Sequence, residues 1–288
     1  MTGAGGLLGG RLAELLAAHH DVVGTRHRGA IPGALAAVDV DLLSVASLSA
    51  ALDSARPEVV VHSAALADAD RCQAEPALAR QVNVEASAAL ARLCRARGVR
   101  LIAISTDLVI SGERPFARED DRADPRLVYG RTKLEGEEVV LAEAPGAAVV
   151  RVALVLGRGF GPRATASEAI AWALGAGRRL RLFTDQFRTP IDAASVADAL
   201  LRLIDRPLAG RFHVGGPERL SRHELGLRVA RVLGLPAHGI EAATQTALAV
   251  GAPRPADTSL DCGRARAELE WAPRALDDAI RESRRAAL

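Results

Sequence analysis

Short apolar runs alternate with longer segments of helical periodicity along the first half of the chain. The runs at 22–25, 36–40, 58–63, 101–105 and 147–156 are typical of strands, and 58–63 is continuously apolar, like a strand buried on both faces. Helical spacing covers 47–55, 77–97 and the segment from 129 to about 143. This alternation predicts an α/β fold: a Rossmann-like doubly wound parallel sheet that binds ligands at the carboxyl ends of its strands.

The second half of the chain mixes shorter elements. Helices are expected at 166–176 and 193–205, a short strand at 180–183, and a strand at 211–214 that returns to the main sheet. Ser221 and Glu224 form a capping-box pattern at the start of a further helix. We therefore expect two regions: 1–155, rejoined by 187–215, as the nucleotide-binding domain, and 156–288 as a smaller substrate-binding region over the cleft.

Three glycines open the chain. Gly3, Gly6 and Gly9 are followed by leucines at helical spacing, a pattern that permits a tight turn and lets backbone N–H groups approach a pyrophosphate. Such a turn normally follows a buried strand, yet only two residues precede Gly3. The first strand is thus missing, and we expect the true start to lie several residues upstream, because a sheet without its middle strand leaves backbone groups unpaired.

A basic cluster follows the first predicted strand. Arg26, His27 and Arg28 come directly after it, with no acidic residue at the strand's end. An acid there would bind a ribose 2′-hydroxyl, whereas an arginine suits a 2′-phosphate. The cluster favours NADPH as cofactor; NADH stays open, and a solvated basic loop is the alternative interpretation of these residues.

The single tyrosine and the single lysine of the chain are four residues apart. Tyr129 and Lys133 would share one face of a helix, where the ammonium should lower the phenol pKa from ~10 toward neutrality. The same ammonium suits ribose hydroxyls. Thr106, at the tip of the strand at 101–105, would add a hydroxyl across the cleft. These three residues predict a catalytic group for proton transfer in carbonyl/alcohol chemistry.

Composition narrows the class of protein. The 288 residues carry a formal charge of +2 without a long block of like charges, which argues against a nucleic-acid partner. Cys72, Cys94 and Cys262 are widely spaced and predict buried thiols in a reducing cytoplasm, with no disulfide or metal site. The sequence shows no signal peptide and no apolar run of membrane-spanning length, so we expect a cytoplasmic protein without a membrane partner.

Seven short motifs occur in a specific order along nearly the whole chain. They lie at 2–9, 61–65, 83–87, 105–109, 129–137, 185–190 and 254–261. In this order and spacing they resemble the extended short-chain dehydrogenases/reductases, above all the dTDP-4-dehydrorhamnose reductase branch, and are similar to the regulatory subunit of methionine adenosyltransferase. The resemblance implies an NADPH-dependent reductase of the keto group of a nucleotide-activated deoxysugar, with Tyr129 as proton donor.

The resemblance also implies roles for individual residues. The glycine turn with Leu7 and Leu8 would hold the cofactor diphosphate, Asp41 and Leu42 the adenine, and Ala64, Ala65 and Lys133 the ribose and nicotinamide. Thr106 would hydrogen-bond the substrate oxygen. Arg188 and Arg254 would grip the substrate diphosphate, for which a guanidinium fork is suited, with surface ion pairs as the alternative. His213 is expected to be structural, and Trp172 and Trp271 to lie in the core.

Three positions depart from the family's usual Ser-Thr-Asp-Tyr-Val-Phe-Asp-Gly. Leu108, Ile110 and Ser111 replace a tyrosine, a phenylalanine and an aspartate near the substrate, which leaves the identity of the sugar open. Related dehydratases carry glutamate where Leu108 stands, and leucine cannot transfer protons, so a dehydratase is disfavoured. A non-catalytic NADP-binding regulatory subunit and a nucleotide-sugar epimerase remain as alternatives, and a homodimer remains open.

Overall fold

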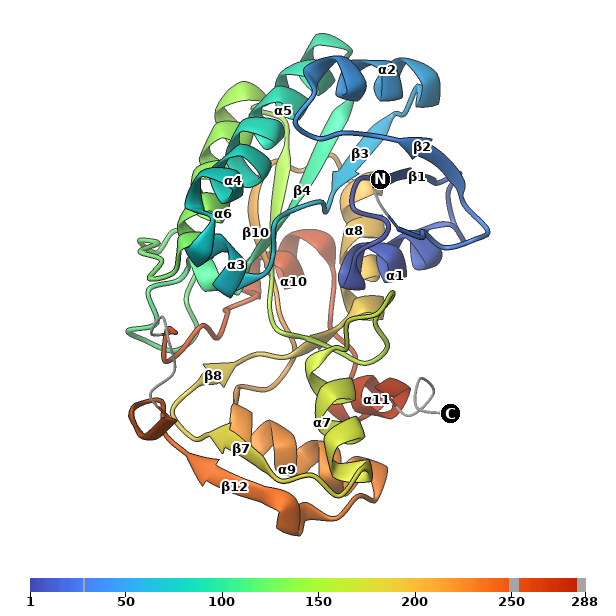
Figure 1. Ribbon diagram of the computed structural model, residues 1–288. Coiled ribbons are helices and arrows are strands. Elements are labelled where there is room, and N and C mark those ends of the chain that lie inside the picture. Colours follow the sequence, from blue (N-terminus) through green and yellow to red (C-terminus); the bar gives the residue numbers. More distant parts are fainter. Residues whose placement is uncertain (28, 249–253, 284–288) are drawn as a thin grey trace.

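A parallel sheet between two layers of helices forms the larger part of the molecule (Figure 1). The structure, a computed structural model, describes residues 1–27, 29–248 and 254–283. Four parallel strands lie in the order β10–β5–β4–β3: Gly210–Val214, Ala148–Val152, Arg100–Thr106 and Val59–His62. β1 (Val23–Arg26) and β2 (Ala36–Asp39) form a parallel pair beyond β3. The predicted α/β fold is confirmed, and the strand expected at 211–214 does join the main sheet.

Alternate strand residues face two separate cores. Ile102 and Ile104 of β4 pack with α1 (Leu7–Leu16) and α8 (Ala193–Asp205). Leu101 and Ala103 of the same strand pack with α2 (Val45–Ala55), α5 (Ala86–Ala96) and α6 (Val128–Glu143) on the other face. Since successive strand side chains point to opposite faces, one apolar run fills both cores.

A smaller unit lies below the sheet in Figure 1 and is built around a third apolar cluster. Its helices are α7 (Ala166–Gly175), α9 (Arg222–Leu233) and α11 (Leu276–Arg281). Its short strands form three two-stranded sheets, β6–β9, β7–β12 and β8–β11, with the bounds β6 (Val155–Leu156), β7 (Leu180–Phe183), β8 (Phe187–Arg188), β9 (Ile191–Asp192), β11 (Leu220–Ser221) and β12 (Ile240–Ala243). The other α-helices of the described chain, which are not part of this smaller unit, are α3 (Ala69–Ala74), α4 (Pro76–Arg80) and α10 (Gly263–Leu269). Ser221 and Glu224 make the predicted capping box at the start of α9.

Three sequence expectations are corrected. The strand at 147–156 is two strands, because the chain leaves the main sheet after Val152 and pairs again with β9. The helix at 77–97 is divided by a π-helical turn, Gln81–Glu85. Trp172 is not a core residue: it is 59% exposed, with the Arg178 guanidinium over its ring, whereas Trp271 is buried as expected.

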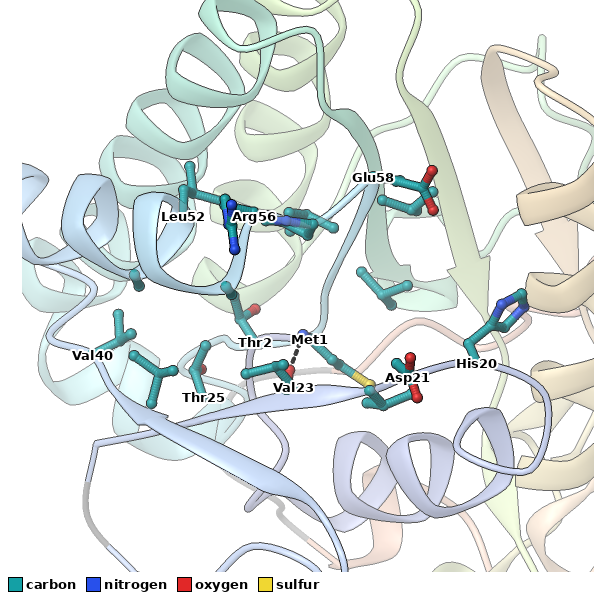
Figure 2. Close-up of a pocket in the computed structure, with 18 of the residues that line it drawn as sticks. Met1, Thr2, His20, Asp21, Val23, Thr25, Val40, Leu52, Arg56 and Glu58 are labelled. Carbon is teal, nitrogen blue, oxygen red and sulfur yellow. Dashed lines mark hydrogen bonds between the residues drawn. The ribbon is translucent and has the colours of Figure 1, made fainter.

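A groove of about 560 Å³ separates β1 from β3 (Figure 2). At its end, the Met1 amino group donates to Val23 O at 2.6 Å and Thr25 N donates to Met1 O at 2.8 Å. On the other side, Thr2 N donates to Val61 O at 3.0 Å. Met1 and Thr2 thus form the end of a parallel strand that the groove continues. The predicted gap in the sheet is confirmed in the described residues.

Four strand-forming apolar residues joined ahead of Met1 should stabilise the fold. They would contact the apolar groove wall, including Val38, Val40 and Val59, and would replace a terminal ammonium whose pKa burial lowers to about 6. We expect the free energy of unfolding to rise by roughly 1–3 kcal/mol, measured by urea denaturation at pH 7. A Gly-Ser extension of equal length is the control, and equal stability of the two proteins would contradict this interpretation of the groove.

Candidate active site

The glycine turn lies against the loop that follows β3. Gly3 has a φ of +72°, and a Cβ on it would lie 2.6 Å from Ala64 N; a Cβ on Gly9 would lie 2.2 Å from Gly3 O. Helix α1 begins at Leu7 with Gly6 as an N-cap that offers no side-chain hydrogen bond. The first N–H groups of α1, including that of Leu8, are therefore not capped by a side chain and suit a diphosphate. Ala65 follows Ala64 in the same loop.

The residues expected to hold adenine and the 2′-phosphate follow the next two strands. Asp41 is exposed and accepts a hydrogen bond from Leu43 N at 3.0 Å, while Leu42 packs against the core of α2 and α5. Arg26 ends β1 as expected, but its Nε lies 2.7 Å from Oδ1 of Asp39 at the end of β2. Sequence reasoning missed this exposed ion pair, which lowers the pKa of Asp39. Arg28 lies outside the described residues.

Thr106, Tyr129 and Lys133 meet at the carboxyl end of β4. Helix α6 approaches this strand end closely, since a Cβ on Gly130 would lie 2.3 Å from Leu108 O. Lys133 Nζ donates to Ile104 O at 2.8 Å. Thr106 hydrogen-bonds the Tyr129 hydroxyl, a contact that acts to lower the Tyr129 pKa. The structure thus brings together the three residues that the sequence predicts to be catalytic.

The predicted lowering of the Tyr129 pKa is wrong. Burial of the hydroxyl, reinforced by the Asp107 carboxylate, raises the Tyr129 pKa well above its usual value, and the Thr106 hydrogen bond opposes this rise only partly. The ammonium of Lys133 lies on the carbonyl of Ile104, and burial lowers the Lys133 pKa to about 8. Tyr129 is consequently a neutral phenol at physiological pH, able to give a proton.

His62 connects helix α5 with the residue before the glycine turn. Its ring lies 2.7 Å from Thr2 Oγ1 and 3.1 Å from Ser87 Oγ. Burial, together with the charge of Lys133, lowers the His62 pKa to about 3. His62 thus ties Thr2, the residue before Gly3, to α5, and it lies near enough to Lys133 of α6 for that charge to lower its pKa.

Stability should therefore fall in mild acid. His62 and His213 are buried, with pKa values lowered to about 3 and about 4. In the unfolded chain both histidines bind a proton as the pH falls below 6.5, whereas in the native state they stay neutral. Each histidine should therefore lower the free energy of unfolding by roughly 2 kcal/mol at pH 5. Urea denaturation at pH 7 and pH 5 measures this, and a His62→Gln protein should lose less stability. An equal loss in both proteins would contradict the assignment.

Asn83 is a structural residue of the site that sequence reasoning left without a role. Its Oδ1 accepts from Leu66 N at 2.8 Å, and its Nδ2 donates to Leu66 O at 3.1 Å and Thr132 Oγ1 at 3.0 Å. The amide therefore holds the loop after β3 against α6. The motif at 83–87 contained the residue, but only the fold shows what it binds.

The two predicted substrate arginines differ in their surroundings. Arg188 is buried: its Nη1 donates to Phe187 O at 2.6 Å, and its Nε lies 3.7 Å from Oδ2 of Asp107. Arg254 is largely exposed, 3.9 Å from Oδ1 of Asp70. Arg188 therefore lies beside the carboxyl end of β4, next to Thr106, whereas Arg254 lies at the protein surface.

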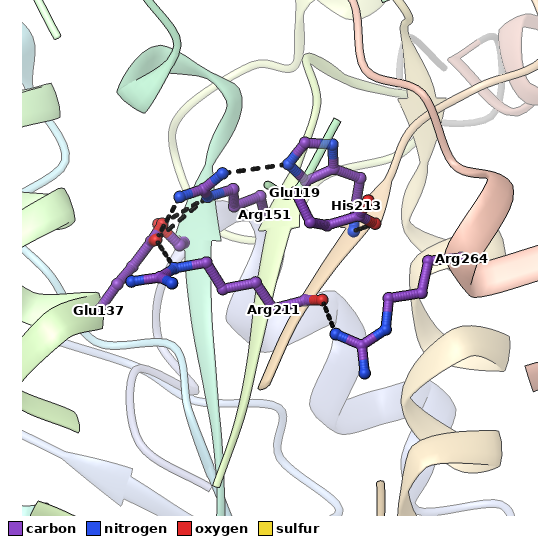
Figure 3. Close-up of polar contacts among 7 residues, drawn as sticks. Glu119, Glu137, Arg151, Arg211, His213 and Arg264 are labelled. Atoms are coloured by element: carbon purple, nitrogen blue, oxygen red, sulfur yellow. Dashed lines mark hydrogen bonds and ion pairs between the residues drawn. The ribbon is translucent and has the colours of Figure 1, made fainter. Parts of the chain in front are cut away.

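A buried network of ion pairs and hydrogen bonds holds α6 against the sheet (Figure 3). Glu137 Oε2 lies 2.7 Å from Arg151 Nη2 and 3.1 Å from Arg211 Nε, and its Oε1 accepts from Ser105 Oγ at 2.5 Å. Arg151 Nη1 lies 3.2 Å from His213 Nε2, so His213 has the structural role predicted for it. The network joins α6 to β4, β5 and β10.

The described residues contain no group of three or more His, Cys, Asp or Glu side chains placed to hold a metal ion. Within the ranges that the structure covers, no helix is long and apolar enough to cross a bilayer.

Comparison with known proteins gives consistent results along the chain. The family model described as RmlD substrate binding domain matches residues 1–287. A dTDP-4-dehydrorhamnose reductase of Streptomyces griseus is 37% identical (92% of this chain, 85% of that protein). The probable low-salt glycan biosynthesis reductase Agl14 of Haloferax volcanii is 33% identical (96% and 94%), and methionine adenosyltransferase 2 subunit beta of Bos taurus is also 33% identical (92% and 80%).

Solved structures show the same architecture. A hypothetical dTDP-4-dehydrorhamnose reductase from Sulfolobus tokodaii superposes with a TM-score of 0.84 at 30% identity, covering 96% of this chain and 97% of that one. MoeE5 in complex with UDP-glucuronic acid and NAD superposes with a TM-score of 0.82 at 25% identity, covering 100% and 98%. The likeness extends over both the sheet domain and the smaller unit.

Proposed function

The chain belongs to the RmlD substrate binding domain family, and from that membership we propose that it is an NADPH-dependent reductase of the keto group of a nucleotide-activated deoxysugar. Two of the relatives described above carry reductase in their names. Residues 1–155 with 187–215 would hold the cofactor, and 156–288 would cover the sugar nucleotide. The observation that carries the proposal is the meeting of Thr106, Tyr129 and Lys133 at one strand end.

The glycine turn supports a dinucleotide cofactor. Gly3 and Gly9 let the turn pack closely against its own backbone and the loop after β3, and the N-terminus of α1 has no side-chain cap. MoeE5, a similar structure, contains NAD. The bound nicotinamide would supply a hydride to the keto carbon. Arg26 favours the 2′-phosphate of NADPH, although NADH would suit the same turn.

The protein's own groups would handle the proton. Tyr129, neutral because its pKa is raised, would donate to the alkoxide that forms on the sugar. Thr106 would hydrogen-bond the same oxygen and orient it toward the phenol. Lys133, anchored on Ile104, would bind the ribose and place positive charge beside the developing anion.

Replacing Arg26 by alanine should change the cofactor preference. The guanidinium contacts only an exposed partner, Asp39, and can turn to a 2′-phosphate without leaving a buried group unpaired. We expect the KM for NADPH to rise roughly tenfold, as for loss of one charged hydrogen bond, with the KM for NADH unchanged. Steady-state kinetics with both cofactors measure these KM values. An equal change in the KM for NADPH and the KM for NADH would show that Arg26 does not bind the 2′-phosphate.

The proposal is tested by following NADPH oxidation with a set of dTDP- and UDP-linked 4-keto-6-deoxy sugars. We expect turnover on at least one, with one alcohol formed for each NADPH consumed. A second candidate is a non-catalytic NADP-binding regulatory subunit, which the similarity to methionine adenosyltransferase 2 subunit beta favours. Absence of turnover on every sugar nucleotide, combined with tight NADPH binding and a stoichiometric enzyme partner, would support that candidate.

A further inference from the structure

A chain of buried polar side chains runs from the glycine turn to α6. Each of its five members is at most 5% exposed, and each is hydrogen-bonded to the next. In order from the turn to the helix, the members are Thr2, His62, Ser87, Asn83 and Thr132. The chain also bonds the loop at 63–67, which follows β3 and contains Ala64 and Ala65.

The hydroxyl of Ser87 determines the tautomer of His62. Ser87 Oγ donates its one proton to Asn83 O at 2.9 Å, so His62 Nε2, at 3.1 Å, must donate to Ser87 Oγ. His62 Nδ1 is then an acceptor, and the Thr2 hydroxyl donates to it over 2.7 Å. Thr2 Oγ1 in turn accepts from Ala64 N at 3.3 Å. These bonds are all satisfied only by a neutral ring that carries its proton on Nε2.

A second contact of the chain fixes the same loop two residues further on. The Asn83 amide accepts from Leu66 N and donates to Leu66 O, and it also donates to Thr132 Oγ1 at 3.0 Å. Thr132 Oγ1 donates to Tyr129 O at 3.0 Å, in the first turn of α6. The loop is consequently held at Ala64 from the glycine turn and at Leu66 from the helix that carries Tyr129.

The His62 ring can accept from Thr2 only while it is neutral. Burial and the charge of Lys133 keep it neutral by lowering its pKa to about 3. A charged ring would carry a proton on Nδ1 and would leave the Thr2 hydroxyl without its acceptor. A buried polar group left unpaired costs about 1–3 kcal/mol. Buried networks in which every group is paired also fix one arrangement of their members.

We propose that His62, through the hydrogen bond that its Nδ1 accepts from Thr2, positions the loop at 63–67 for NADPH. The acceptor on the ring orients the Thr2 hydroxyl, and the oxygen of that hydroxyl fixes Ala64 N. A Cβ on Gly3 of the glycine turn would lie 2.6 Å from this nitrogen. His62 is a positioning residue, since it acts through Thr2 and the loop. The part of the loop in cofactor binding rests on the proposed function, whereas the hydrogen-bond chain is independent of it.

Two substitutions separate the two nitrogens of the ring. In His62→Asn the amide oxygen replaces Nδ1 and keeps the acceptor for Thr2; in His62→Gln the amide nitrogen replaces Nε2 and keeps only the donor to Ser87. Fluorescence titration should give a dissociation constant for NADPH that rises roughly tenfold in His62→Gln and less than about threefold in His62→Asn. The control His19→Gln replaces an exposed histidine and should change the constant less than about twofold.

Melting temperatures of the same proteins measure stability separately from cofactor binding. A purely structural role for His62 would weaken NADPH binding in both variants in step with their loss of stability. Equal rises of the dissociation constant in His62→Asn and His62→Gln, or rises that follow the melting temperatures, would therefore overturn the inference.

Should neither His62 variant fold, Thr2→Val and Thr2→Ser decide. The valine has no hydroxyl and should weaken NADPH binding roughly three- to tenfold, whereas the serine keeps the hydroxyl and should change it less than about twofold. Unchanged binding in Thr2→Val would overturn the inference.

The inference and the proposed function fail separately. A difference in NADPH binding between the two His62 variants, in a protein without reductase turnover, keeps the positioning role and ends the reductase. Equal binding by the two variants, in a protein with normal turnover, does the reverse.

Discussion

A Tyr129→Phe protein is expected to bind NADPH with unchanged affinity and to lose roughly 10²- to 10⁴-fold in kcat, the usual contribution of a positioned general acid. The phenol is neutral at the end of β4, where Thr106 hydrogen-bonds it, and the Lys133 ammonium is anchored on Ile104 O. Phenylalanine keeps the ring in its cluster with Leu66, Cys72 and Val128, so the fold should be preserved. Only the transferable proton is removed.

Stopped-flow oxidation of NADPH and fluorescence titration of the cofactor separate these two effects. The control is Arg131→Ala, an exposed residue two positions along the same helix, which should leave kcat within about twofold because surface substitutions rarely disturb a fold. A Tyr129→Phe protein that retained a third or more of the wild-type kcat would remove Tyr129 from the chemistry.

A Glu137→Ala protein is expected to lose roughly 3–5 kcal/mol of the free energy of unfolding. Glu137 is the acid between Arg151 and Arg211, and both it and Arg151 are almost fully buried. Without it a buried guanidinium has no countercharge, and Ser105 loses its acceptor. Because Ser105 precedes Thr106 and Glu137 follows Lys133 on α6, turnover should fall as well.

Urea denaturation of Glu137→Ala beside Glu135→Ala checks this prediction. Glu135 lies two residues away on the same helix, half-exposed, 3.4 Å from Arg80 Nε. Its loss should cost no more than about 1 kcal/mol, as for other surface ion pairs. Equal destabilisation by the two substitutions would mean that the buried network does not hold α6 to the sheet.

The sequence predicted those features that depend on local spacing. Tyr129 and Lys133 share a helix because four residues span one turn, and the strands are visible because each is a short apolar run. The gap in the sheet followed from the two residues before Gly3, and Met1 and Thr2 do occupy the end of a strand ladder. Each of these features is set by residues close together in the chain.

Features set by distant residues were missed. The Tyr129 pKa rises because burial and Asp107 outweigh the Thr106 hydrogen bond, while Lys133 bonds a strand carbonyl instead. Arg26 finds its acid, Asp39, on the neighbouring strand. Trp172 is exposed, because its helix faces outward there. Partners of this kind depend on strand order and register, which a local pattern does not contain.

Transfer of the cofactor hydride is the most direct test of the account. Incubating the protein with a 4-keto-6-deoxy sugar nucleotide and NADPH deuterated at the transferable position of its nicotinamide, followed by mass spectrometry of the sugar product, measures it. We predict an alcohol carrying one deuterium at the former keto carbon, with equimolar NADP. An unreduced keto sugar, or an altered sugar without deuterium, would contradict a reductase acting through Tyr129.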